Sequence, residues 1–133
     1  MTAYAALSDL YVVMSLATMG SLSVARQQSI LDARNDFADD FLRARYKLPA
    51  QAPFLASLVQ NICKLAAYDC ARVRGYNPAA GADVILEKDK LDALAWFDGV
   101  ARQRIHPNII EATGGTDPGY AAPLVVSRPL QGW

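Results

Sequence analysis

The sequence predicts an all-α protein, a four-helix bundle of one short and three long helices followed by an extended C-terminal arm. Apolar residues recur at helical spacing in four stretches. Glycine and proline separate these stretches at positions where helices commonly begin or end. The 133 residues, 53% of them hydrophobic, suit a single core. We expect a helical bundle domain over residues 1–104 and an arm over residues 105–133.

The first, short helix is expected to be capped by Ser8 or Asp9 and to run to about Met19, where Gly20 ends it. Its apolar run from Leu10 is shorter than the ~20 residues of a membrane span, and no basic region precedes it. The sequence therefore predicts neither a secretion signal nor a membrane helix.

The second helix is expected from about Ser23 to Tyr46. Its predicted buried face consists of Ile30, Ala33, Phe37, Phe41 and Ala44. The opposite side carries Asp32, Asp36, Asp39, Asp40 and Arg43. Asp39 and Arg43 stand four apart and can pair.

This acidic side has two interpretations. A metal site is one, but no histidine or glutamate accompanies the aspartates, and they lie along the helix axis rather than converging. The favoured interpretation is a solvated or subunit-facing surface. We therefore predict an inter-subunit charged face formed by Asp36, Asp39, Asp40 and Arg43.

The third helix, from about Phe54 to Arg74, is predicted to be central. Leu55, Leu58, Ile62 and Leu65 form one apolar stripe, which Val59, Ala66, Ala67 and Val73 widen. Pro53 suits the first helical position and Gly75 the residue past the end. Cys63 and Cys70 lie roughly 10 Å apart on this helix, too far for a disulfide, and are expected to be buried thiols.

Asp69 points toward the apolar stripe in this pattern. It could be a catalytic carboxylate, or a carboxylate held by an arginine. We predict the second, a structural ion pair in the core with Arg72 or Arg45, and with Arg74 also nearby in sequence, because an unpaired buried charge is costly.

The fourth helix is expected from about Val84 to Arg104, with Asp83 as its cap. Its predicted buried face consists of Leu91, Leu94, Phe97 and Ala101, and Trp96 is expected to be half-exposed.

The arm differs in composition from the rest of the chain, with four of the 7 prolines and four of the 8 glycines. It contains a β-prone triplet and a terminal tryptophan. We predict an interaction arm that binds a neighbouring chain by strand addition, with the residues Leu124, Val125, Val126, Arg128, Leu130 and Trp133. The alternative is an arm folded back over its own helices.

No catalytic set is apparent. The single histidine, His106, has no second histidine and no nearby cysteine, and Gly114-Gly115 lacks the lysine of a phosphate loop. We therefore predict no enzyme, no cofactor and no metal. The 13 basic and 13 acidic side chains balance, which argues against a protein that coats nucleic acid.

A series of motifs resembles the phage Mu gp36-like family, a family encoded among head and tail genes of tailed phages and prophages. The motifs, in order, are Tyr4-Ala5-x-Leu7-x-Asp9-Leu10, Leu42-x-x-Arg45-Tyr46-x-Leu48-Pro49, Leu65-Ala66-x-Tyr68-Asp69-x-Ala71-Arg72, Ala93-x-x-Trp96-Phe97-x-x-Val100-Ala101-x-x-Arg104-Ile105, and Val126-Ser127-Arg128-Pro129-Leu130-x-Gly132-Trp133. Their order along nearly the whole chain carries the resemblance. The connection from Met19 to Ser23 is shorter than in many relatives.

The resemblance implies a structural virion protein of a bacteriophage: a head-completion or head–tail connector (adaptor) subunit. Such subunits form a ring, expected to be dodecameric, that docks on the portal protein and receives tail or head-closure proteins. DNA would pass through its lumen without sequence specificity, and assembly would take place in the bacterial cytoplasm without a membrane.

Two other functions remain. A DNA-binding regulator of a phage or prophage would use the basic residues near helix ends, namely Arg43, Arg45, Lys47, Arg72, Arg74, Arg102 and Arg104. A small enzyme would use Asp69 with an arginine, and would need a pocket at that carboxylate.

Overall fold

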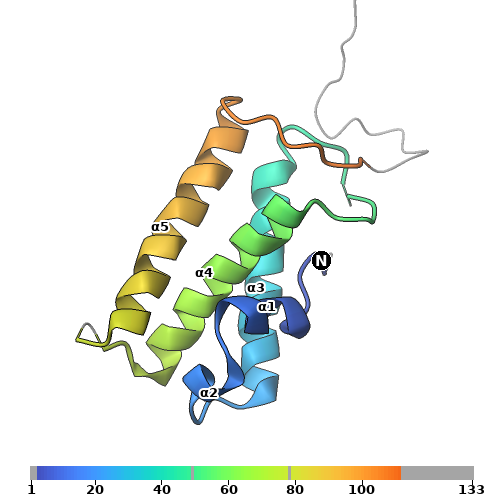
Figure 1. Cartoon of the computed structure of the whole chain (residues 1–133). Helices are drawn as coiled ribbons and strands as arrows, with labels where there is room; N and C mark the ends of the chain where they lie inside the picture. Colours follow the sequence, from blue (N-terminus) through green and yellow to red (C-terminus); the bar gives the residue numbers. More distant parts are fainter. Residues whose placement is uncertain (1–2, 49, 78, 112–133) are drawn as a thin grey trace, which may run out of the picture.

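The computed structural model describes residues 3–48, 50–77 and 79–111, and these form an all-α bundle (Figure 1). Its helices are α1 (Leu7–Val13), α2 (Leu16–Met19), α3 (Val24–Leu42), α4 (Ala56–Gly75) and α5 (Gly81–Ala101). No β-strand occurs in the described part of the chain. The predicted fold class is confirmed; the arm from residue 112 onward, including its candidate strand, lies outside the described residues.

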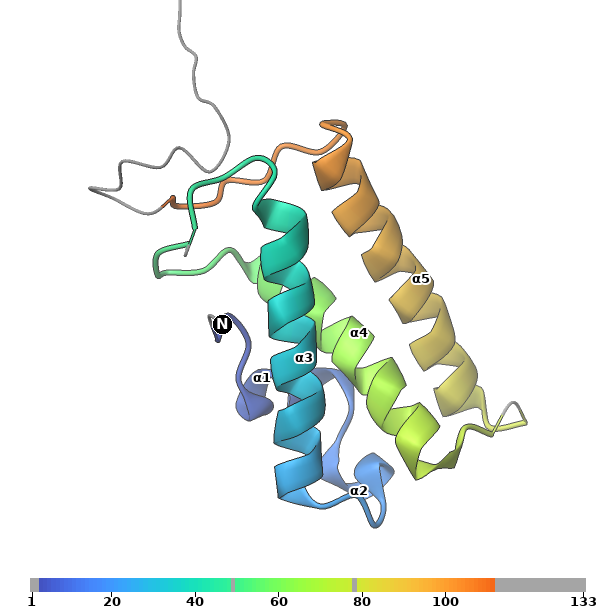
Figure 2. The same cartoon turned by 180° about the vertical axis from the view of Figure 1, so that it is seen from behind.

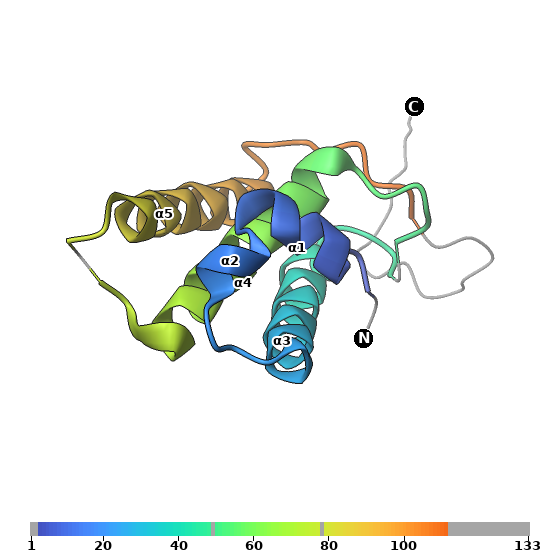
Figure 3. The same cartoon turned by 60° about the horizontal axis from the view of Figure 1, so that its bottom comes forward.

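Helix α4 is the centre of the bundle, as predicted. α3 and α5 pack along it, and α1 and α2 cover it on another side (Figures 1 and 3). Leu58, Ile62 and Leu65 are fully buried. Cys63 and Cys70 are buried free thiols, also as predicted. The helix begins at Ala56, so Pro53 precedes it rather than opening it.

The C-terminal end of α4 is set by Gly75. Its φ of 120° is a backbone conformation that residues with a Cβ rarely adopt, and no atom lies within 4 Å of where a Cβ would stand. The chain turns there, and α5 begins six residues further on. Backbone freedom, rather than a lack of space, therefore explains this glycine.

The predicted first helix is two helices. The backbone is extended at Met14 (φ −139°, ψ 108°) and at Ser15, and the Ser15 hydroxyl accepts a hydrogen bond from the Thr18 amide at 3.3 Å. Serine is a favoured N-cap, so it starts a new helix inside the apolar run. Gly20 then ends α2 with a φ of 64°.

Helix α3 buries a different face from the predicted one. Leu31, Ala38 and Leu42 are inside, together with Gln27 and Asn35. Of the predicted set, Ala33 and Ala44 are exposed, and Ile30, Phe37 and Phe41 are half-buried. A count of apolar residues missed this face because it is partly polar.

Each polar residue of that face is hydrogen bonded. Asn35 accepts from the Ala5 amide at 3.1 Å and donates to the Ala5 carbonyl at 3.2 Å. Gln27 accepts from the Tyr11 hydroxyl at 2.7 Å and donates to the Leu22 carbonyl at 2.9 Å. Buried amides with satisfied partners tie the N-terminal segment to α3.

Helix α5 also buries a shifted face. Leu86, Ala93, Phe97 and Val100 are buried, whereas Leu91 is 57% exposed. Ala101 is exposed as well, and Trp96 is half-buried, as expected. The aromatic rings of Phe37, Phe41, Trp96 and Phe97 pack together where α3 meets α5, with neighbouring centroids 4.7–5.8 Å apart.

Candidate interaction surfaces

The segment Ile105–Glu111, here called the tail root, is fastened across one end of the bundle. It runs from the end of α5 toward the connection between α3 and α4 (Figures 1 and 2). The Gln51 amide donates to the Ile110 carbonyl at 2.7 Å, and the Lys47 amide donates to a Glu111 carboxylate oxygen at 2.7 Å. The described chain therefore ends at a firmly held position beside the α3–α4 connection.

Arg45 holds the beginning of the tail root. Its Nη1 donates to the carbonyls of Val100 at 2.8 Å and Ile105 at 3.0 Å, and its Nη2 lies 3.1 Å from His106 Nδ1. A guanidinium at the last carbonyls of a helix also interacts favourably with the helix dipole. Tyr46 donates from its hydroxyl to the Pro107 carbonyl at 3.2 Å, and burial raises the pKa of this tyrosine above its ordinary value.

Packing under the tail root is tight at Gly99. A Cβ on Gly99 would lie 2.6 Å from Cδ1 of Ile105, well inside van der Waals contact. Ile105 is half-buried against the core. Gly99 therefore lets the tail root close onto α5.

The predicted core ion pair has a different partner and a different position. Asp69 binds Arg34 of α3 through both oxygens, at 2.5 Å from Nε and 3.0 Å from Nη2. The Asp69 side chain is 28% exposed, so the pair lies at the edge of the core. Arg45 belongs to the tail root, and Arg72 is exposed. The prediction overlooked Arg34 because it considered cations near Asp69 in sequence or at the end of the second helix.

A shallow hollow beside Asp69, Arg72 and Val73 opens to solvent. Because Arg34 already engages both carboxylate oxygens, Asp69 is poorly placed to accept a proton from a substrate. The geometry of this hollow gives little support to an enzyme built on Asp69.

The predicted inter-subunit charged face loses one member. Asp39 is only 7% exposed and accepts a hydrogen bond from the Tyr4 hydroxyl, so it is turned into the bundle. Arg43 pairs with Asp40 at 3.0 Å instead of with Asp39. Asp36, Asp40 and Arg43 are exposed on α3 and can still contact a neighbour.

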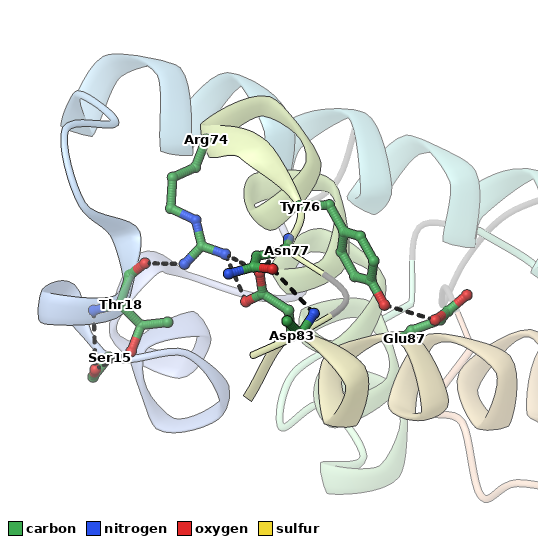
Figure 4. Close-up of polar contacts among 8 residues, drawn as sticks. Ser15, Thr18, Arg74, Tyr76, Asn77, Asp83 and Glu87 are labelled. Atoms are coloured by element: carbon green, nitrogen blue, oxygen red, sulfur yellow. Dashed lines mark hydrogen bonds and ion pairs between the residues drawn. The ribbon is translucent and has the colours of Figure 1, made fainter. Parts of the chain in front are cut away.

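The opposite end of the bundle holds a buried ion pair that the sequence did not reveal (Figure 4). Arg74, at the end of α4, places Nη2 at 2.6 Å from each oxygen of Asp83, whose side chain is 3% exposed. Nη1 of Arg74 donates to the Thr18 carbonyl at 2.6 Å. The Asn77 amide also donates to Asp83, at 2.9 Å. Asp83, the predicted cap of α5, is thus linked through Arg74 to α4 and α2. The helix itself begins two residues before Asp83, at Gly81.

These hydrogen bonds hold the pKa of the Asp83 carboxyl below its ordinary value, mainly through Arg74 and then through the Asn77 amide. At the surface beside them, Tyr76 donates to Glu87 at 2.7 Å, and this bond raises the pKa of Tyr76 to about 12. The same end therefore has a buried pair and an exposed pair side by side (Figure 4).

An apolar ridge on α1 separates two grooves. Val12 is 87% exposed, and it lines both grooves together with its neighbour Val13. We call the first the α5-side groove, about 350 Å³, lined also by Ile85 and Asp89. The second, the α4-side groove, has about 310 Å³ and is lined also by Asp9 and Val59. Neither groove has a basic side chain in its lining.

The basic residues that a DNA-binding function would use are mostly engaged elsewhere. Arg45 and Arg74 bind within the bundle. Arg43 pairs with Asp40, while Arg102 and Arg104 both pair with Asp98 at 2.9 and 3.1 Å. Arg45 and Arg74 are thereby turned away from phosphates, whereas Arg43, Arg102 and Arg104 lie at the surface in exposed pairs.

Two further searches cover the described residues only. None of their helices is long and apolar enough to cross a membrane. Within the same residues, no group of three or more histidine, cysteine, aspartate or glutamate side chains is arranged to hold a metal ion.

Comparison with known proteins gives no relative: no family model, no curated protein and no solved structure matches this chain. The fold and its surfaces define the class, an all-α helical bundle with a fastened tail root. The resemblance to the phage Mu gp36-like family consequently depends on the sequence motifs alone. The predicted arm residues, Leu124, Val125, Val126, Arg128, Leu130 and Trp133, lie outside the described residues.

Proposed function

We propose that this chain is a structural virion protein, a subunit of the head–tail connector ring of a tailed phage, which docks on the portal and joins capsid to tail. The ordered motifs and the resemblance they carry are the origin of this proposal. The observation that supports it best is the tail root. Glu111 is held at the end of the bundle, and 22 residues with few charges follow it.

A fastened root suits an arm that acts on a surface beyond its own bundle. An arm binds more tightly when its starting point is already ordered, because less conformational entropy is lost on binding. Leu130 and Trp133 are the proposed anchors on the portal or on the next subunit, since buried aromatic side chains often dominate interface energies. The exposed charges Asp36, Asp40 and Arg43 would set the register between neighbours rather than the affinity.

Binding to the portal protein encoded in the same genome tests the proposal. The full chain should sediment with purified portal rings and add a ring of density visible by electron microscopy. Deletion of residues 120–133 should abolish this binding while the far-ultraviolet circular dichroism of the bundle is retained.

Two point variants sharpen the test. Trp133→Ala and Leu130→Ala should each weaken portal binding at least tenfold, about 1.4 kcal/mol or more. Lys88→Ala, an exposed change on α5, serves as the control and should bind as the parent does. Equal binding by the deleted and intact chains would refute the arm, and sequence-specific duplex binding with a steep salt dependence would favour the DNA-binding regulator.

A further inference from the structure

The ridge formed by Val12 and Val13 is an apolar surface that the described part of the chain does not cover. Among the described residues, Val12 is the most exposed large hydrophobic side chain, at 87%, and Ile85 across the α5-side groove is 61% exposed. The two grooves share this ridge and so form one continuous surface over α1. Figure 3 shows α1 lying over α4, and α1 also contacts α3.

The charged side chains that line this surface are acidic. Asp9 lines the α4-side groove and Asp89 lines the α5-side groove. One oxygen of Asp9 accepts from the Ala6 amide at 2.9 Å, and Asp89 forms no ion pair with any described residue. A partner for this surface should therefore be apolar and carry positive charge.

A segment of the same chain has this chemistry. Residues 124–133 read LVVSRPLQGW, in which Arg128 is the one charged side chain and no acidic side chain occurs. We propose that this segment binds the Val12 ridge of a neighbouring copy of the chain, with Arg128 beside Asp89 or Asp9. This inference deepens the proposed function and depends on its self-assembly, because it names the surface that receives the arm.

The position of the tail root favours a neighbour over the same copy. Sixteen residues of α5 separate Ile85 from Ala101, a rise of roughly 24 Å, and the tail root then runs away from α5 (Figures 1 and 2). The twelve residues 112–123 that link Glu111 to Leu124 have a typical end-to-end distance of about 19 Å as a flexible chain. Reaching the α5-side groove of the same copy would require this linker to extend beyond its typical length. A neighbouring copy can place its ridge nearer.

Photo-crosslinking of the full chain tests the inference. Benzoylphenylalanine replaces Leu130, and equal amounts of ¹⁵N-labelled and unlabelled protein are mixed and irradiated. Mass spectrometry should find crosslinks from position 130 to residues around Val12 and Ile85, and about half of them should join a labelled to an unlabelled copy. Crosslinks within single copies, crosslinks elsewhere or none would each overturn it.

Charge variants provide the second readout. Asp89→Lys together with Asp9→Asn should lower the yield of mixed crosslinks about fivefold, and Arg128→Glu added to this background should restore part of the loss. Asp92→Lys is the matched control, an exposed aspartate on α5 outside the groove linings, and should leave the yield unchanged. Equal losses for the Asp89→Lys/Asp9→Asn double variant and for Asp92→Lys would overturn the proposed contact.

This result is separable from the portal test. Mixed crosslinks without portal binding would support the ridge contact and refute the connector assignment. Portal binding without mixed crosslinks, measured on the assembled ring, would keep the connector and refute the ridge contact.

Discussion

Replacing Arg74 by methionine should destabilise the bundle severely. The change removes both hydrogen bonds to Asp83 and the one to the Thr18 carbonyl, and leaves a carboxylate that is 3% exposed with the Asn77 amide as a remaining donor. Breaking a buried pair from one side costs about 3–5 kcal/mol. We expect about 3 kcal/mol, because the Arg74 side chain itself is 19% exposed.

Urea unfolding followed by circular dichroism measures this loss, and thermal unfolding should show a midpoint about 12 °C lower for a chain of this size. Arg102→Met is the matched control. It breaks the exposed pair with Asp98 on α5, whose side chains are 66% and 48% exposed, and the midpoint should stay within error. The double variant Arg74→Met/Asp83→Asn should lose less unfolding free energy than the sum of the losses of the two single variants, since no buried charge is left unpaired.

Acid should remove the same stabilisation. The pKa of Asp83 is lowered from 3.8 in the folded state, so the pair stabilises the bundle fully above about pH 5 and progressively less as the pH falls below 3.8. The difference in unfolding free energy between the parent and Asp83→Asn should accordingly be constant from about pH 5 to 8 and should shrink as the pH falls below 3.8. Equal stability of parent and Arg74→Met at neutral pH would refute the reasoning.

Three other predictions concern the buried cysteines, the contact of the tail root with α5, and the N-terminal segment. Burial raises the pKa of the Cys63 thiol to about 12 and of the Cys70 thiol to about 11, so both should react with a thiol reagent at pH 8 in urea but not in the folded protein; rapid labelling without urea would contradict this. Gly99→Ala should cost about 1 kcal/mol despite its better helix propensity, and Ile105→Val, which removes the atom at 2.6 Å, should recover part of it in a double-variant unfolding series; a more stable Gly99→Ala protein would show that the contact relaxes freely. Asn35→Ala should cost about 2 kcal/mol and speed amide hydrogen exchange in the N-terminal segment, and unchanged exchange there would mean that other contacts hold it.

The central helix was predictable because its residues repeat one simple pattern. Leu58, Ile62 and Leu65 are apolar, spaced four and three residues apart, and all buried, so periodicity alone identifies the face. Phe97 on α5 followed from the same pattern, and the burial of both cysteines followed from their position on α4.

The face of α3 could not be predicted in this way. It buries Gln27 and Asn35, whose stability inside depends on partners in the N-terminal segment. Asp39 was taken as a surface charge for the same reason, although it bonds to Tyr4. Hydrophobic periodicity treats such residues as exposed, because it cannot see a hydrogen-bond partner that is distant in sequence.

Ion-pair partners were the least predictable part of the candidate surfaces. Asp69 pairs with Arg34, which precedes it by thirty-five residues, and Asp83 pairs with Arg74 across a helix end. Both depend on how the helices pack rather than on local spacing. The Val12 ridge was missed too, because hydrophobic periodicity does not show which apolar side chains the rest of the fold leaves uncovered.

The fastening of residues 105–111 decides how the bundle would bear mechanical load. A pull on the chain beyond Glu111 would act first on the bonds to Lys47 and Gln51, and then on Arg45, before it reached the backbone of α5. Tension is thereby diverted into the α3–α4 connection instead of unwinding α5 from its last turn. In the proposed connector ring, such an arrangement would let the joint bear load while the subunit stays folded.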